Sequence, residues 1–135
     1  MNFLKNVIAI DRVPCNLLTG VFRKSASEVT VPQSIPWEEL CILTPAKLSY
    51  NNKVENKITV WQSQLVFKTR EEKDWTGNWA YRLTLVDGQK LLLGDGIRPY
   101  PVTLMNQNLP DNLSDSQLTE VTVTYNSRWR IAIIR

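Results

Sequence analysis

Apolar and polar side chains alternate with a period of two along most of the chain. The clearest stretch, Trp79–Val86, places four large apolar residues on one side of a strand, and Leu118–Tyr125 alternates in the same way. Successive side chains of a strand point to opposite faces, so this period is the mark of a half-buried strand. A chain dominated by it predicts an all-β fold.

Other segments between turn-forming residues also predict strands. They are Asn6–Ile10, Glu28–Val31, Trp37–Thr44, Lys47–Tyr50, Lys57–Thr69, Lys90–Leu93, Val102–Met105 and Arg128–Ile134. Trp37–Thr44 could instead be one helical turn, and we predict about eight or nine mostly antiparallel strands in all, with little helix. The length of 135 residues predicts a single domain spanning residues 1–135. The alternation suits a sandwich and a barrel equally, so both architectures stay open.

Turn residues predict how some strands connect. Asn51-Asn52 predicts a turn before the long strand 57–69, whose apolar residues change face near Ser63, which predicts a bulge or bend there. The strand 118–125 is expected to form a hairpin with 128–134 through Asn126-Ser127. Ser114 and Gln117 resemble the capping box of one helical turn.

Asp87-Gly88 is a strong signal for a two-residue hairpin loop. Such a loop pairs Leu83 with Leu92 and places Leu91 and Leu93 on the opposite face. Both faces of the hairpin then carry apolar side chains. We therefore expect it to lie centrally in the domain or to be covered on its second side.

The composition narrows the possible chemistry. The chain has no histidine, which excludes an imidazole acid or base, a Ser-His or Cys-His nucleophile pair and a histidine metal site. Cys15 and Cys41 are too few for a zinc site. They could form one disulfide, but their apolar neighbours favour two buried free thiols. No carboxylate pair, glycine-rich phosphate loop or calcium loop has the required spacing, so we predict a non-enzyme without metal or small-molecule cofactor.

The leading interpretation is an assembly protein that acts through protein–protein surfaces and forms a homo-oligomer. The predicted contact residues are Leu91 and Leu93 on the hairpin and Asn106, Leu109, Asp111 and Leu113 in the long polar segment 106–117. Long loops in compact β domains are often functional. If Leu91 and Leu93 prove to be buried inside a single chain, their part of this interface is wrong.

Two alternatives come from other residue types. Arg82, Arg128 and Arg130, interleaved with aromatic residues, could line a nucleic-acid groove on a β-barrel, although a net charge of +3 is mild for that function. The five tryptophans suggest a carbohydrate-binding module, or a glycan-active enzyme, with Trp75 or Trp79 as the stacking platform.

A resemblance adds to this interpretation. The stretches Tyr81–Gly88, Leu93-Gly94, Arg98–Pro101 and Leu118–Tyr125 resemble small all-β proteins encoded among the tail and morphogenesis genes of tailed phages and prophages. The likeness covers roughly the C-terminal half. It implies a virion or assembly component and carries no catalytic residues.

The expected location follows from the segments that are missing. The apolar run Val7–Ile10 is too short for a signal peptide, and no stretch approaches the length of a membrane span. We expect no membrane partner, and a location in the cytoplasm, or in a virion if the chain is phage-derived.

Overall fold

A computed structural model describes residues 3–25, 27–70, 74–94, 100–108, 118–127 and 131–134. Within these ranges the chain forms strands and one short 3-10 helix, η1 (Cys15–Leu17), which confirms the all-β prediction. Eleven strands form where about eight or nine were expected. They are β1 (Phe3–Pro14), β2 (Phe22–Arg23), β3 (Glu28–Thr30), β4 (Glu38–Leu40), β5 (Leu43–Glu55), β6 (Ile58–Thr69), β7 (Trp79–Leu85), β8 (Lys90–Leu93), β9 (Val102–Asn108), β10 (Leu118–Ser127) and β11 (Ala132–Ile134).

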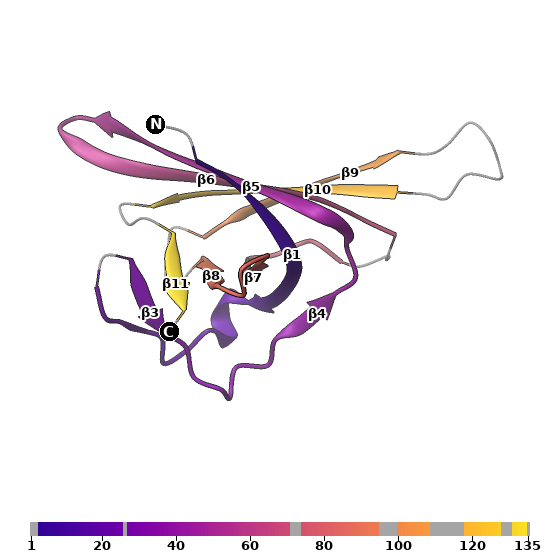
Figure 1. Cartoon of the computed structure of the whole chain (residues 1–135), viewed down its shortest axis with the longest axis horizontal. Helices are drawn as coiled ribbons and strands as arrows, with labels where there is room; N and C mark the ends of the chain where they lie inside the picture. Colours follow the sequence, from indigo (N-terminus) through magenta and orange to yellow (C-terminus); the bar gives the residue numbers. More distant parts are fainter. Residues whose placement is uncertain are drawn as a thin grey trace.

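The strands form one mixed sheet that folds into two layers (Figure 1). Its order is β2-β3-β11-β8-β7-β1-β5-β6-β10-β9, with β4 on β1. The end strands β2 and β9 do not pair with each other, so the sheet is not closed into a barrel and the architecture is sandwich-like. All pairs are antiparallel except β11 with β3.

Strand β1 belongs to both layers. Its first half, Phe3–Val7, pairs with β5 in the upper layer of Figure 1, and its second half pairs with β7 and β4 in the lower layer. The register with β7 shifts between Val7 and Ala9, so Ile8 is an extra residue. A bulge of this kind bends a strand and increases its twist, which turns β1 from one layer into the other.

The main core lies between the layers. From the upper layer it takes buried side chains of β5, β6 and β10, and from the lower layer those of β7 and β8. The largest members include Leu48, Leu65, Tyr81, Leu83 and Leu93. Each layer thus turns an apolar face towards the other, built from every second residue of its strands.

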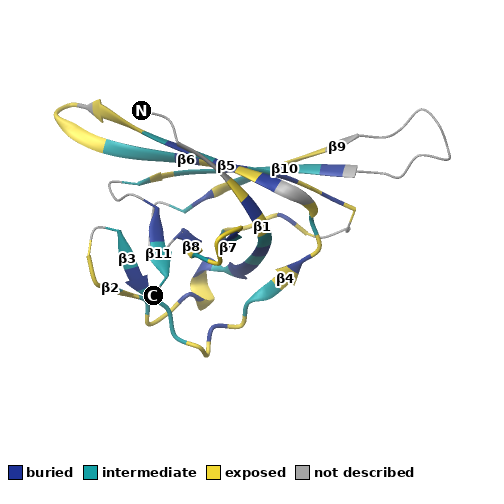
Figure 2. Cartoon of the chain, in the orientation of Figure 1, coloured by how far each residue is buried: buried dark blue, intermediate teal, exposed yellow. Residues whose placement is uncertain are grey.

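A second core covers the other side of the lower layer. Ala80, Leu92 and Ala132 meet the segment 15–37 there, through Cys15, Leu18 and Ile35. In Figure 2 buried residues (dark blue) occur in both layers, whereas the tip of the β5–β6 hairpin is exposed (yellow). Residues of β7 and β8 belong to both cores. The expectation that both faces of this hairpin are covered is therefore confirmed.

The hairpin register differs by one residue from the expected one. Leu83 lies opposite Leu91, and Arg82 opposite Leu92. The backbone N–H of Leu85 donates to the carbonyl of Gln89, and that of Gly88 to the carbonyl of Leu85, which closes a three-residue loop. Gly88 has φ of 89° and Asp87 accepts from the Gln89 N–H, the arrangement of a type I turn with a G1 bulge.

This shift corrects the predicted interface. A slip of one residue moves each side chain of a strand to the other face. Leu91 and Leu93 therefore join Leu83 in the main core, and both are buried inside the single chain. The prediction that they form an exposed contact surface is wrong.

The turn between β5 and β6 lies five residues later than predicted. Asn51 and Asn52 are within β5, and the chain reverses at Asn56 and Lys57, which both have positive φ, 50° and 65°. Two left-handed residues are the signature of a type I′ turn, whose twist matches the flanking strands. The bulge lies in β5 between Leu43 and Lys47 rather than at Ser63.

The predicted C-terminal hairpin does not form. Asn126 and Ser127 continue β10, which pairs with β6 and β9. Strand β11 instead pairs with β8 and, in parallel, with β3. Ile131 and Ile133 contact the main core as expected, while Trp129 and the segment 114–117 lie outside the described residues.

A hydrogen bond joins the inner strand β7 of the lower layer to the edge strand β9 of the upper layer. The hydroxyls of Tyr81 on β7 and Thr103 on β9 lie 2.7 Å apart. Burial raises the pKa of Tyr81 to about 12, because the phenolate would lose its hydration, although the bond to Thr103 opposes this shift. The folded chain therefore holds this proton at pH values where an unfolded tyrosine has lost it.

Stability should consequently fall in alkali. The folded pKa exceeds the unfolded value of about 10, so the contribution is complete below pH 10 and is lost as pH rises through 12. A shift of this size corresponds to about 2–3 kcal/mol. We expect Tyr81→Phe to flatten the decline of unfolding free energy measured in urea between pH 9 and 12. An equally steep decline in the variant would contradict this assignment.

Candidate functional site

The cysteines do not form a redox or metal site with each other. Cys15 is buried in the second core, no disulfide joins it to Cys41, and Cys41 is exposed. The prediction of two buried thiols is thus right for Cys15 and wrong for Cys41, which lies in the bend between β4 and β5. Among the described residues, no three His, Cys, Asp or Glu side chains gather in a way that could hold a metal ion.

Arg82, predicted as a nucleic-acid contact, is engaged within the fold. It lies opposite Asp11 on β1, and its Nη2 is 2.8 Å from the Asp11 carboxylate. Its guanidinium also stacks on Trp37, 4.8 Å from the ring centroid. Asp11 balances its charge and Trp37 covers one of its faces. Arg128 and Arg130 lie outside the described residues.

The most elaborate polar cluster is centred on Arg12, which the sequence analysis did not single out. Arg12 lies near the end of β1 and is only 4% exposed. Its Nε donates to Glu38 of β4 at 3.1 Å, and its Nη1 to the backbone carbonyl of Asp74 at 2.8 Å. These bonds join β1, β4 and the loop before β7.

Two tryptophans enclose the same guanidinium. Its Cζ lies 3.8 Å from the ring centroid of Trp79 and 4.7 Å from that of Trp75. Cation–π contacts are strongest when the cation is desolvated, as Arg12 is. Trp75 is itself buried and meets the ring of Phe67 edge-on, with centroids 5.8 Å apart. Trp75 is therefore core and does not offer the stacking platform that was predicted.

The loop 74–78 is shaped around this cluster. The Asp74 carboxylate accepts from the hydroxyl and the backbone N–H of Thr76, at 2.6 and 2.9 Å. These hydrogen bonds lower the pKa of Asp74, with a smaller contribution from the nearby charge of Arg12. The Trp79 indole N–H donates to the Thr76 carbonyl at 2.8 Å. Arg12 and Trp79 thus hold the loop against the sheet.

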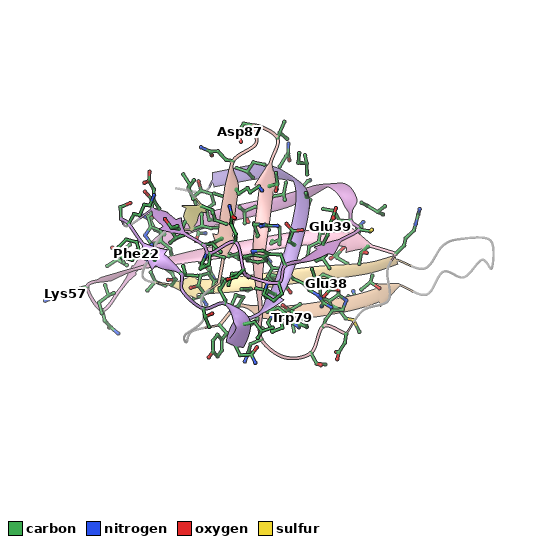
Figure 3. The ribbon with its side chains drawn as sticks, turned by 90° about the horizontal axis from the view of Figure 1, so that it is seen from below. Phe22, Glu38, Glu39, Lys57, Trp79 and Asp87 are labelled. Atoms are coloured by element: carbon green, nitrogen blue, oxygen red, sulfur yellow. The ribbon has the colours of Figure 1, made fainter. Side chains whose placement is uncertain are left out.

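An open cleft of about 370 Å³ lies beside this loop. It is lined by Pro14, Cys15, Asn16, Thr76, Gly77, Asn78, Trp79 and Tyr100. Trp79 and Tyr100 are half-buried, and Asn16 and Asn78 are exposed. Figure 3 shows Trp79 and Glu38 near the middle of one face of the molecule, with Phe22 towards one end. The cleft combines aromatic rings with amide and hydroxyl groups.

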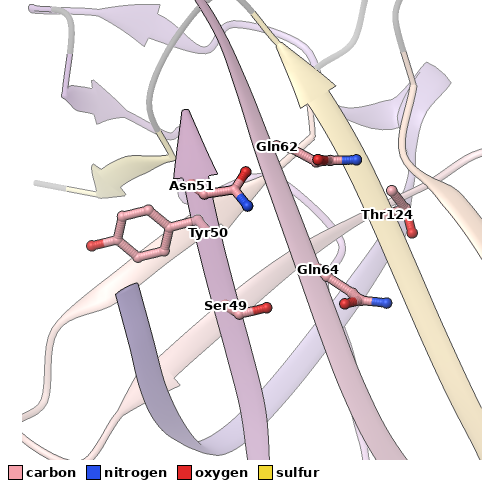
Figure 4. Close-up of a pocket in the computed structure, with 6 residues that line it drawn as sticks. All are labelled: Ser49, Tyr50, Asn51, Gln62, Gln64 and Thr124. Atoms are coloured by element: carbon pink, nitrogen blue, oxygen red, sulfur yellow. The ribbon is translucent and has the colours of Figure 1, made fainter. Parts of the chain in front are cut away.

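A second hollow, of about 360 Å³, lies on the upper layer (Figure 4). It is lined by Ser49, Tyr50, Asn51, Gln62, Gln64 and Thr124. Gln64 pairs with Ser49 on one side and Thr124 on the other, so hydroxyl and amide side chains of three strands form a flat polar face. None of these residues is charged, and the hollow has polar donors and acceptors without an exposed aromatic platform.

The edge strand β9 exposes several apolar side chains next to the segment 106–117, which was predicted to form contacts. Among the described residues only β10 pairs with it, so its other side has no neighbouring strand. Leu104 is 64% exposed and Met105 is 53% exposed, and Val102 is exposed as well. Asn106, one of the predicted contact residues, is exposed on the same strand. Leu109, Asp111 and Leu113 lie outside the described residues.

The strand predicted at this edge was three residues too short. The expected strand Val102–Met105 continues to Asn108 by pairing along the whole of β10. The sequence of β9, VTLMNQN, contains no charge and no proline, but it marks an exposed edge only once the strand order is known. Natural edge strands usually carry charged residues or proline, which prevent pairing with a further strand.

Comparisons with known protein families and structures found no match. No family model matches the chain, and no solved structure matches it significantly. No helix within the described part of the chain is long and apolar enough to cross a membrane.

The Arg12 cluster makes a testable contribution to stability. Arg12→Met keeps the length and apolar stem of the side chain but removes the donors to Glu38 and Asp74 and the cation between two indoles. Breaking a buried ion pair typically costs several kcal/mol, and Glu38 is partly solvated, so we expect a loss of about 2–3 kcal/mol. Urea unfolding followed by tryptophan fluorescence measures this loss. Lys90→Met, which removes an exposed charge, should change stability by less than about 0.5 kcal/mol; equal effects would contradict the role of Arg12.

Proposed function

We propose that this protein is a non-enzymatic assembly subunit that acts through protein–protein surfaces, with the open edge of β9 as its principal contact. The observation that carries the proposal is an edge of seven residues with exposed Leu104 and Met105 and no charge. Unpaired backbone N–H and C=O groups along such an edge are a template for a further strand. The resemblance to tail and morphogenesis proteins of tailed phages agrees with a subunit of this kind, in a virion or a tail-associated assembly.

The opposite end of the sheet shows what a protected edge looks like in this chain. Strand β2 has only two residues, Phe22 and Arg23, so it offers little backbone and carries a cation. Short strands and basic side chains are common means of preventing edge-to-edge pairing. The contrast between the two ends favours β9 as a surface adapted for a partner.

The hairpin of β5 and β6 offers a second apolar surface. It extends beyond the body of the molecule on the side away from β9 in Figure 1. Val54 and Ile58, near its turn, are both exposed. An extended hairpin with apolar side chains at its end suits contact with a neighbouring subunit, a role that had been expected of the segment 106–117.

A single charge on the edge tests the proposal. Leu104→Lys places a cation on the outward-facing side of β9, where it would have to be desolvated in an interface. We expect the wild-type protein to show a discrete multiple of 15.6 kDa by light scattering after size exclusion, and the variant to show the monomer mass.

The matched control is Val86→Lys. Val86 lies in the β7–β8 loop and is 70% exposed, so Val86→Lys adds the same charge to the protein at a site away from β9. It should leave the assembly intact. If Leu104→Lys and Val86→Lys have the same mass as the wild type, the edge of β9 is not the assembly surface.

A carbohydrate-binding module is a second candidate function, favoured by the cleft beside Trp79. Rings and amide side chains together are suited to a neutral, polyhydroxylated ligand. Arg12 occupies one face of Trp79, so Tyr100 is the more available ring. We expect any fluorescence response to a panel of neutral oligosaccharides to be lost in Tyr100→Ala and kept in Phe22→Ala, an exposed aromatic on β2. No response in the wild type would exclude this candidate.

A further inference from the structure

We infer that the partner of β9 is a second copy of the same strand, paired antiparallel about a two-fold axis at Met105. This inference rests on the proposed function and names its partner. The two upper layers would then form one continuous sheet across two chains, in the order β6-β10-β9 followed by β9-β10-β6 of the second copy.

The charge pattern of β9 suits its own copy. In a two-fold pair each residue meets the same segment of chain, so a strand with net charge would oppose like charges and be destabilised. The sequence VTLMNQN carries no charge at any position, so self-pairing has no electrostatic penalty. An acidic or basic peptide would find no opposite charge on this edge to attract it.

The exposed apolar residues select the register. Pairing centred on Met105 overlaps all seven residues and makes the most backbone hydrogen bonds. Met105 then faces Met105 of the second copy directly, and Leu104 faces Asn106 of the second copy with Leu104 of that copy on the diagonal. Directly opposite Cβ atoms lie about 4.5–5.5 Å apart and diagonal neighbours about 7–8 Å apart, both within reach of long side chains.

Strand β9 is already ordered for this pairing. It pairs with β10 from Val102 to Asn108, and Thr103 bonds to Tyr81 of the other layer. A rigid strand loses little conformational freedom on association, which favours binding. One pair of seven-residue strands buries less than the standard interface, so we expect a dimer that dissociates on dilution.

Cysteine crosslinking tests the register. In a Cys41→Ser background, which removes the exposed native thiol, Met105→Cys should convert to a disulfide-linked species of twice 15.6 kDa under mild oxidation. Opposed residues in an antiparallel pair have Cα atoms about 4.5 or 5.5 Å apart, and both distances suit a disulfide.

Two controls accompany this variant. In the proposed register, residue 106 of one chain lies diagonally across from residue 106 of the second chain. The two cysteines of Asn106→Cys are then too far apart for a disulfide, so this variant should remain monomeric on a non-reducing gel. Val86→Cys reports collisional crosslinking by an exposed thiol away from the edge. Preferential crosslinking of Met105→Cys over both supports the inference, whereas crosslinking of Asn106→Cys instead would overturn the register.

The outcomes also separate this inference from the proposed function. A wild-type oligomer that Leu104→Lys dissociates, without crosslinking of Met105→Cys, would overturn self-pairing at Met105 while supporting assembly through β9. A polydisperse aggregate would overturn the defined dimer. A monomer at every concentration, with no crosslinking above the Val86→Cys level, would contradict both.

Discussion

The bend in β1 is the constraint on which the architecture depends. Because Phe3–Val7 pairs with β5 and Val7–Pro14 with β7, one strand supplies backbone hydrogen bonds to both layers. The extra residue at Ile8 lets the strand turn without losing its pairing on either side. The main core exists because this turn brings the apolar faces of β6 and β7 opposite each other, and Arg12 lies on the same strand only a few residues further along.

The local alternation was sufficient to predict the strands but insufficient to predict all their registers. Strand β7 has the expected faces, and β10 buries Val121 and Val123 as its pattern requires. The register of β7 with β8 depends on the length of the loop between them, and Asp87-Gly88 is compatible with a two-residue or a three-residue loop. The Asp87 carboxylate bonds to the Gln89 N–H and selects the longer loop, and this single choice moved Leu91 and Leu93 from a predicted interface into the core.

Long-range pairing was beyond a local pattern. The C-terminal strand was assigned to its neighbour in sequence, whereas β11 crosses to β8 and lies parallel to β3, about a hundred residues earlier in the chain. Its alternation would fit either position, because Ile131 and Ile133 bury the same face in both. Likewise, Asn56-Lys57 is a weaker turn signal than Asn51-Asn52, and the turn is placed by the pairing of β5 with β6 over its full length.

The polar cluster and the open edge escaped prediction for opposite reasons. Arg12 stands in the sequence as an ordinary charged residue after an apolar run, and only the approach of Glu38, Trp75 and Trp79 from distant segments turns it into a buried clamp. The edge of β9 required a knowledge of strand order, because VTLMNQN would be unremarkable in the middle of a sheet.

Charge distribution connects these two features. The central strands of the lower layer contain arginines, but each is neutralised within the fold, Arg12 by Glu38 and Arg82 by Asp11. At the far end of the other layer an outer strand has no charge at all and leaves Leu104 and Met105 in solvent. A chain with 29 Lys, Arg, Asp and Glu side chains among 135 residues has the means to protect that edge as it protects β2. That the seven residues of β9 include none of them is the reason to regard this edge as a contact surface rather than as the accidental boundary of a sheet.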